Sequence, residues 1–109
     1  MKRFYAIQPS FYEVLKKHKN ILYELQSCPP IQKEKIFTQI TQEQILISCT
    51  SYFQEDIQAK ENVLYYKHEL KSQVYFMEFH DCYIQMADLE NPFYELLKRK
   101  YRYFLVEDI

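Results

Sequence analysis

Residues 63–86 read VLYYKHELKSQVYFMEFHDCYIQM, and the class of the fold depends on whether this stretch is helical or extended. Val63, Tyr66 and Leu70 recur with the spacing of one helix face, but this apolar stripe ends near residue 72. A second apolar stripe with helical spacing then points in a different direction and consists of Tyr75, Phe79, Cys82, Tyr83 and Met86. The change of direction predicts two helices that meet at residues 71–73.

Strands are the alternative for the same stretch, because residues 63–70 and 74–80 are rich in aromatic and β-branched residues. A period of two from residue 74 onward puts Glu78 and His80 on one face, however. The same period puts Asp81 and Gln85 on the other face. Neither face would be continuously apolar, so the pattern favours helices over strands.

Two capping boxes predict where helices begin outside this stretch. Ser10 with Glu13 has the spacing in which two side chains satisfy backbone N–H groups of the first helical turn. Thr41 and Gln44 repeat the pattern. Each box precedes a run of apolar residues with helical spacing. We therefore predict helices over residues 10–27 and 42–58.

A third start signal lies at Asn91 and Pro92, where a capping side chain precedes a residue that needs no N–H partner at the first helical position. The helix that starts there is predicted to reach about residue 105, and its apolar face contains Phe93, Leu97, Tyr101 and Phe104. Residues 31–40 fit neither period, so the sequence does not decide between a short helix and an extended connection.

The chain of 109 residues contains no glycine, a residue that many functional loops require. Phosphate-binding loops, dinucleotide-binding turns and nucleophile elbows use glycine where the backbone approaches a ligand or takes a positive φ. The favoured two-residue β-hairpins use it as well. The absence of glycine therefore argues against the common nucleotide-dependent enzymes and favours helices.

Together these patterns predict an all-α fold. We expect one helical domain over residues 1–109, built as a compact bundle of four or five helices. The alternative is an α+β fold with short strands at the two termini, over residues 3–7 and 101–106, or over residues 63–84.

The spacing of cysteine and histidine residues does not match a catalytic or metal site. Cys28, Cys49 and Cys82 are too far apart in sequence for a zinc ribbon or a redox motif, and the last two are predicted to be small core residues. His80, Asp81 and Cys82 are adjacent, but neighbours on a helix diverge by about 100° per residue and do not converge on one ion. We therefore expect no metal, no cofactor and no enzymatic activity.

Charge is segregated along a chain whose formal net charge is −1. Residues 1–40 carry a net charge of +4, residues 41–95 carry −7, and the last 14 residues carry +2. Residues 98–103, KRKYRY, mix cations with aromatic rings, the combination that neutralises phosphates and stacks on bases. A nucleic-acid-binding regulator that uses the basic N- and C-terminal segments is therefore the alternative function, although the slightly acidic chain disfavours it.

Tyrosine is unusually frequent, with 11 residues in the chain. Tyrosine and arginine are enriched among the residues that dominate binding energy at protein interfaces. Arg99, Arg102 and Tyr103 lie opposite the apolar face of the last predicted helix. Tyr12 and Tyr23 flank the apolar face of the first predicted helix. We predict that these five residues contact a partner.

The sequence thus favours a small, non-enzymatic regulator or inhibitor that binds a protein partner. Its size and AT-rich residue composition are typical of proteins carried by phages and mobile elements. No apolar run reaches the ~18 residues of a membrane span, and charges interrupt the N-terminus before a signal-peptide core, so we expect a cytoplasmic protein without membrane contacts. The sequence does not identify the partner, and a homodimer is a further option.

Overall fold

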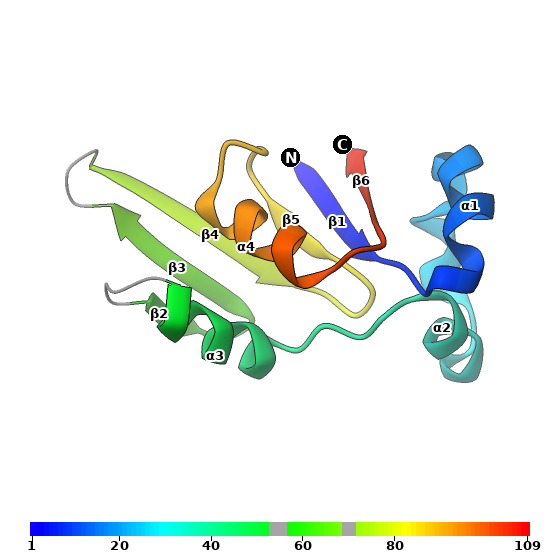
Figure 1. The fold of residues 1–109 in the computed structure, drawn as a ribbon, viewed down its shortest axis with the longest axis horizontal. Coiled ribbons are helices and arrows are strands. Elements are labelled where there is room, and N and C mark those ends of the chain that lie inside the picture. Colours follow the sequence, from blue (N-terminus) through cyan, green and yellow to red (C-terminus); the bar gives the residue numbers. More distant parts are fainter. Residues whose placement is uncertain (53–56, 69–71) are drawn as a thin grey trace.

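The computed structural model describes residues 1–52, 57–68 and 72–109, and a six-stranded antiparallel sheet runs through them (Figure 1). The strands, which are arranged in the order β2-β3-β4-β5-β1-β6, are β1 (Lys2–Ala6), β2 (Ile57–Lys60), β3 (Val63–His68), β4 (Gln73–Phe79), β5 (Ile84–Met86) and β6 (Phe104–Asp108). The α-helices are α1 (Pro9–Lys17), α2 (Pro30–Ile36), α3 (Gln42–Tyr52) and α4 (Pro92–Lys100). Two short 3-10 helices, Lys19–Ile21 and Glu24–Ser27, lie between α1 and α2.

The fold is α+β, so the prediction of an all-α helical bundle is wrong. The two helices predicted over residues 63–86 are instead β3, β4 and β5. Within β4 successive residues do point to alternate faces, because Tyr75, Met77 and Phe79 all contribute to one core. The alternation stops at the end of β4, and β5 begins only at Ile84. When a period of two is continued through the turn between β4 and β5, each face receives both polar and apolar residues. For this reason the sequence pattern favoured helices.

The two ends of the chain pair as neighbouring strands. β1 and β6 are antiparallel, from Lys2 opposite Asp108 to Ala6 opposite Phe104. The helix predicted to reach residue 105 ends at Lys100, because the apolar residues that follow it join the sheet beside β1. The arrangement found is therefore the α+β alternative, with strands at both termini and within residues 63–84.

The hairpins form without glycine. Only Glu61 and Asn62 separate β2 from β3, and Glu61 takes a φ of 55°. Ser72, just before β4, takes a φ of 52°. Residues with a Cβ atom pay about 1–2 kcal/mol for this left-handed conformation. Asn62 offsets part of that cost, because its carbonyl accepts from the Phe79 N–H at 2.8 Å and its side chain donates back to the Phe79 carbonyl at 3.0 Å.

Two of the three predicted helix starts are confirmed. The Thr41 N–H donates to Gln44 Oε1 at 3.4 Å, and the Gln44 N–H donates to Thr41 Oγ1 at 3.3 Å. Asn91 Oδ1 accepts from the Phe93 N–H at 2.9 Å. The helix start predicted from the capping box at Ser10 is wrong. The helix α1 already begins at Pro9, and its cap residue, Gln8, makes no side-chain capping bond.

The predicted helices are also longer than the observed ones. The helix predicted over residues 10–27 ends at Lys17, and the two 3-10 helices follow it. The helix predicted over residues 42–58 is α3, which is described as far as Tyr52, and residues 57–60 belong to β2. The undecided residues 31–40 form most of α2 and then an extended connection that begins at Phe37.

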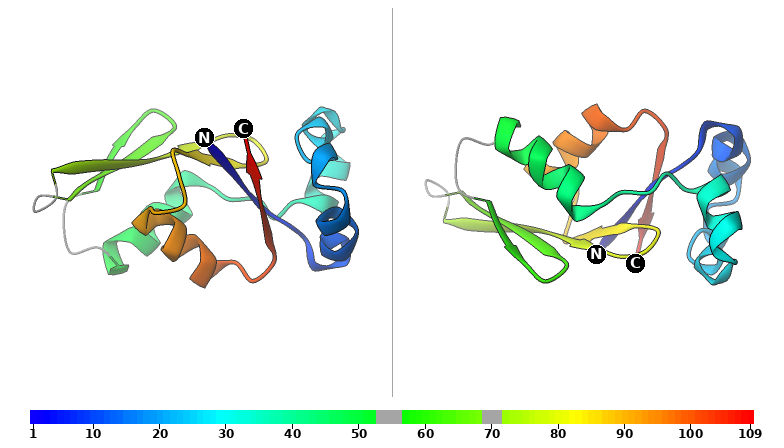
Figure 2. Two further views of the ribbon diagram at one scale, coloured as in Figure 1. Left: turned by 90° about the horizontal axis from the view of Figure 1, so that it is seen from above. Right: turned by 90° about the horizontal axis from the view of Figure 1, so that it is seen from below.

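The sheet has a core on each face. α3 and α4 lie on the same side of the sheet and cover the first core (Figure 2). Its fully buried members include Phe4, Ala6, Ile45, Cys49, Leu64, Met77, Ile84, Met86, Phe93 and Leu97. Because successive strand residues point to opposite faces, β1 sends its alternate residues, Tyr5 and then Ile7 beyond its end, to a second core. That second core lies under α1 and α2 and includes Leu15, Leu22, Phe37 and Leu105.

Among the helices of the described residues, α1 and α2 cover the second face of the sheet, beside β1 and β6 (Figure 2). Leu64, Tyr66 and Met77 belong to the first core, so the alternate residues of β3 and β4 point away from α3 and α4. No helix in the described part of the chain covers these residues (Figure 2). We call them the open sheet face: Val63, Tyr65, Lys67, Val74, Phe76 and Glu78. None of the helices in the described residues is long and apolar enough to cross a membrane.

Candidate functional site

Three of the five predicted partner-binding residues lie together in the structure. Tyr12 belongs to α1, and its ring meets the ring of Tyr103 at a centroid distance of 5.3 Å and an angle of 64°. The Arg102 guanidinium carbon lies 5.5 Å from the Tyr103 centroid, and Lys16 Nζ lies 5.8 Å from the Tyr12 centroid. We call Tyr12, Lys16, Arg102 and Tyr103 the Tyr12–Tyr103 cluster. It combines two aromatic rings in contact with each other, and each ring has one cation beside it.

The fold holds both halves of the Tyr12–Tyr103 cluster in place. α1 is anchored by Leu15, which is buried in the second core. On the other side, the Tyr103 carbonyl accepts from the Ile7 N–H at 2.9 Å, and Leu105 is buried two residues later. The sequence prediction omitted Lys16, although its position four residues after Tyr12 places both on one side of a helix. That spacing was the signal by which it could have been found.

The other two predicted residues lie elsewhere. Arg99 is exposed in the last turn of α4 and is not a member of the Tyr12–Tyr103 cluster. Tyr23 is 49% exposed, and its ring lies 4.0 Å from the guanidinium carbon of Arg3 on β1. Tyr23 therefore contributes to a contact between the helical segment and the sheet, a role that the sequence prediction missed.

Arg3 is the centre of a polar network between the two terminal strands. Its Nη1 donates to Glu107 Oε1 at 2.9 Å, and the Tyr5 hydroxyl donates to the same oxygen at 3.2 Å. Burial raises the pKa of the Tyr5 phenol, and the neighbouring Glu107 carboxylate raises it further. The guanidinium also lies 5.4 Å from the ring centroid of Tyr83. This network joins β1 to β6 and is best explained as part of the fold.

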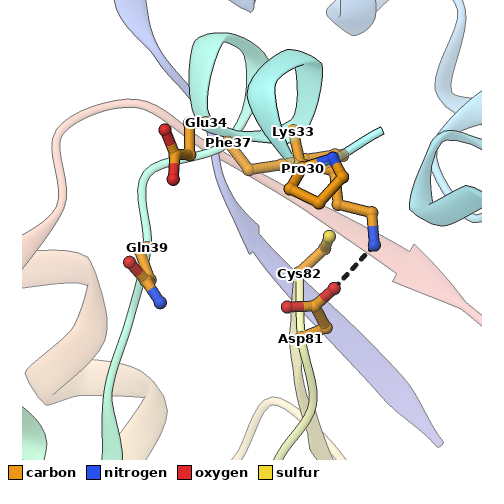
Figure 3. Close-up of a pocket in the computed structure, with 7 residues that line it drawn as sticks. All are labelled: Pro30, Lys33, Glu34, Phe37, Gln39, Asp81 and Cys82. Atoms are coloured by element: carbon orange, nitrogen blue, oxygen red, sulfur yellow. Dashed lines mark hydrogen bonds and ion pairs between the residues drawn. The ribbon is translucent and has the colours of Figure 1, made fainter. Parts of the chain in front are cut away.

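A small cavity of about 230 Å³ opens between α2 and the turn that joins β4 to β5 (Figure 3). Its rim carries an ion pair in which Lys33 Nζ donates to Asp81 Oδ2 at 2.7 Å. Phe37 and the Cys82 thiol form part of its lining. Burial raises the pKa of that thiol, so the thiolate needed for nucleophilic attack is disfavoured.

The adjacent residues His80, Asp81 and Cys82 do not converge on one point. His80 stacks on Tyr83 with 4.5 Å between the ring centroids and contacts Glu78 through Nε2. Asp81 pairs with Lys33 instead. The divergence was predicted for a helix, but it arises here from the turn. Within the described residues, no three His, Cys, Asp or Glu side chains are grouped so that they could hold a metal ion.

The prediction that two cysteines are core residues is confirmed. Cys49 is fully buried in the first core, and Cys82 is buried in the second. Burial raises the pKa of Cys49 from 9.0 to about 11, so this thiol also stays protonated at neutral pH. Neither residue has the low pKa that is typical of a reactive cysteine.

The sequence matches none of the known family models and none of the curated proteins with which it was compared. Among the surface features of the described residues, the Tyr12–Tyr103 cluster has the clearest binding chemistry.

Proposed function

We propose that this protein is a small, non-enzymatic regulator or inhibitor that binds an acidic segment of a protein partner through the Tyr12–Tyr103 cluster. The observation that carries the proposal is the contact between the two tyrosine rings, each with a cation beside it. The four side chains come from α1 and from the connection between α4 and β6, two segments that the fold brings together.

The two rings supply the apolar part of such an interface. Tyr12 and Tyr103 are both half-buried, so each ring is restrained by its neighbours and still has accessible surface. A restrained aromatic side chain loses little conformational entropy when a partner covers it. Its hydroxyl group remains able to bond to the partner.

The two cations supply the preference for an acidic partner. The Arg102 guanidinium can bind a carboxylate through two parallel N–H groups, and Lys16 adds a second positive charge beside Tyr12. Opposite charge on the partner would speed association and fix its orientation. The proposal therefore specifies a peptide segment that contains Asp or Glu next to an apolar residue.

Nucleic acid is the alternative ligand for a surface of this kind. Bases stack on the flat faces of aromatic rings, and Lys and Arg bind phosphates. In the Tyr12–Tyr103 cluster, however, the edge of one ring meets the face of the other, so one face is already partly covered. The edge-to-face geometry therefore favours a protein partner over a nucleic acid.

The proposal can be tested with a random peptide library displayed on phage and selected against the immobilised protein. We expect the enriched peptides to be rich in Asp and Glu. The double variant Lys16→Glu with Arg102→Glu should weaken their binding at least tenfold, a change of about 1.4 kcal/mol. The matched control, Lys35→Glu with Lys60→Glu, changes the net charge equally on other exposed residues and should bind like the unmodified protein.

Two results would contradict the proposal. Equal losses in the double variant and in the control would show that only overall charge matters. Tight binding of labelled oligothymidylate that disappears in Lys16→Glu with Arg102→Glu, without any acidic peptide being enriched, would support the nucleic-acid alternative instead. Circular dichroism of each variant establishes that the fold is unchanged.

A further inference from the structure

The open sheet face combines apolar and charged residues in an ordered pattern. Val74 is 59% exposed, and Lys67 is exposed beside it. Val63, Tyr65 and Phe76 are each half-buried. Aliphatic and aromatic side chains of β3 and β4 are thus accessible on the face opposite the first core.

The strand register places an aromatic pair at the centre of the open sheet face. Tyr65 on β3 is directly opposite Phe76 on β4. Lys67 lies two residues along β3 in one direction, opposite Val74. Glu78 lies two residues along β4 in the other direction, opposite Val63. The positive and the negative side chain therefore flank the aromatic pair on opposite sides.

We propose that two copies of the chain associate through their open sheet faces, related by a two-fold axis that lies between the two sheets, runs roughly across the strands and passes between the two aromatic pairs. A two-fold interface brings the same surface of both copies together. The rotation exchanges the two flanks of the aromatic pair, so Lys67 of each copy faces Glu78 of the other. The interface would then contain two equivalent ion pairs around an apolar centre.

The contacts of Glu78 allow this arrangement. His80 contacts its Oε1, and the carboxylate has a second oxygen that can accept from an incoming lysine. The Glu78 side chain is 34% exposed. Two antiparallel sheets commonly pack face to face at a separation of about 10 Å, with interdigitating side chains between them. Burial of Tyr65, Phe76 and Val74 would supply the hydrophobic contribution.

A second copy fits the open sheet face better than single-stranded nucleic acid does. Tyr65 and Phe76 have the chemistry to stack on bases, and Lys67 could bind a phosphate. Glu78 lies two residues from Phe76 on the same face, however, and would repel a phosphate backbone. A partner that carries both signs of charge satisfies Lys67 and Glu78 together, and a second copy carries both.

The dimer proposal is independent of the proposed function. The open sheet face belongs to β3 and β4, whereas the Tyr12–Tyr103 cluster belongs to α1 and to the connection before β6. A dimer would present two clusters, so it could bind two segments of one partner with increased avidity. Lys16→Glu with Arg102→Glu should leave the dimer dissociation constant unchanged, which distinguishes failure of one proposal from failure of the other.

Sedimentation velocity over a range of protein concentrations tests the dimer. We expect the unmodified chain to show a concentration-dependent change from monomer to dimer. Lys67→Glu and Glu78→Lys should each raise the dissociation constant at least tenfold, because each places like charges opposite each other. The double variant Lys67→Glu with Glu78→Lys again places opposite charges across the interface. Its dissociation constant should therefore be close to that of the unmodified chain. Lys17→Glu, on exposed α1, is the control and should have no effect.

A second variant covers the case in which a charge change disturbs the fold. Val74→Asp alters only an exposed side chain and should abolish the dimer without changing the circular dichroism spectrum. A monomer at all concentrations would overturn the proposal, and so would a dimer that persists in Val74→Asp. Failure of the double charge swap to recover association, with all variants folded, would equally overturn it. Binding of oligothymidylate that is lost in Phe76→Ala would assign the face to nucleic acid instead.

Discussion

Arg3 and Glu107 are 104 positions apart in the chain, and their side chains form an ion pair with 2.9 Å between Nη1 and Oε1. Both side chains are only 17% exposed. The ring of Tyr23 covers the guanidinium, and the Tyr5 hydroxyl donates to the same carboxylate oxygen. The pair joins the first strand to the last, where the sequence offers no local signal for a contact.

Removing Glu107 should destabilise the protein measurably. Glu107→Leu leaves the Arg3 charge half-buried without its acceptor, and we expect a loss of about 2 kcal/mol in the free energy of unfolding, measured with urea. The neighbouring pair of Lys2 and Asp108 provides the control, because the Asp108 side chain is 76% exposed. Asp108→Leu should change the free energy of unfolding far less than Glu107→Leu does, because solvent screens an exposed ion pair. Equal losses in the two variants would show that the Arg3 network has no special role.

The two sequence patterns that resemble capping boxes should differ in their contribution to stability. Thr41→Ala removes the side chain that accepts from the Gln44 N–H, and we expect it to cost about 1 kcal/mol. Ser10→Ala changes an exposed residue within α1 and should change the free energy of unfolding by less than about 0.5 kcal/mol. Urea denaturation of both variants compares them directly, and a larger effect at Ser10 would contradict the assigned start of α1.

Truncation of two apolar residues in the first predicted helix should change the stability by very different amounts. Leu22 is fully buried in the second core, so Leu22→Ala should cost about 2–5 kcal/mol through lost burial and the cavity left behind. Val14 is 56% exposed, so Val14→Ala should stay within about 0.5 kcal/mol. Thermal and urea unfolding measure both effects. A large loss at Val14 would show that this side of α1 is covered in solution.

Alkaline pH should destabilise the fold partly through Cys49. Its pKa is about 11 in the folded protein, against 9.0 when the thiol is exposed in the unfolded chain. Between these values the unfolded state releases the proton while the folded state keeps it, so the free energy of unfolding falls as pH rises. Well below pH 9 the thiol is protonated in both states and contributes no pH dependence.

The slope of stability against pH isolates this contribution. Buried groups such as Cys82 and Tyr101 also have raised pKa values and act in the same direction. Cys49→Ala removes one of these groups, so its free energy of unfolding should fall less steeply between pH 9 and pH 11 than that of the unmodified protein. The comparison uses slopes because the truncation itself lowers stability at every pH. Parallel curves would show that Cys49 does not titrate in this range.

Some features could be predicted because they depend on residues close together in the chain. The bonds between Thr41 and Gln44 span three positions, and Asn91 caps a residue two positions later. The burial of Phe93 and Leu97 likewise follows from helical spacing within α4. Within the candidate site, Tyr12, Arg102 and Tyr103 could be named from the sequence. The high tyrosine content and the positions of these residues beside predicted apolar helix faces are visible without coordinates.

The amino-acid order alone therefore specifies helix starts, several buried positions and a surface rich in tyrosine and arginine, since each of these is a local property. The pairing of strands that are distant in the sequence decides the remaining features of the fold. A strand makes its hydrogen bonds with another segment of the chain. The register that places Lys2 opposite Asp108 therefore depends on both strands and cannot be read from either one alone. Short apolar runs such as residues 74–79 satisfy a helical or an extended period equally well until a neighbouring strand accepts their N–H groups. The contact of Tyr12 with Tyr103 exists for the same reason, because the pairing of β6 with β1 brings the connection before β6 beside α1.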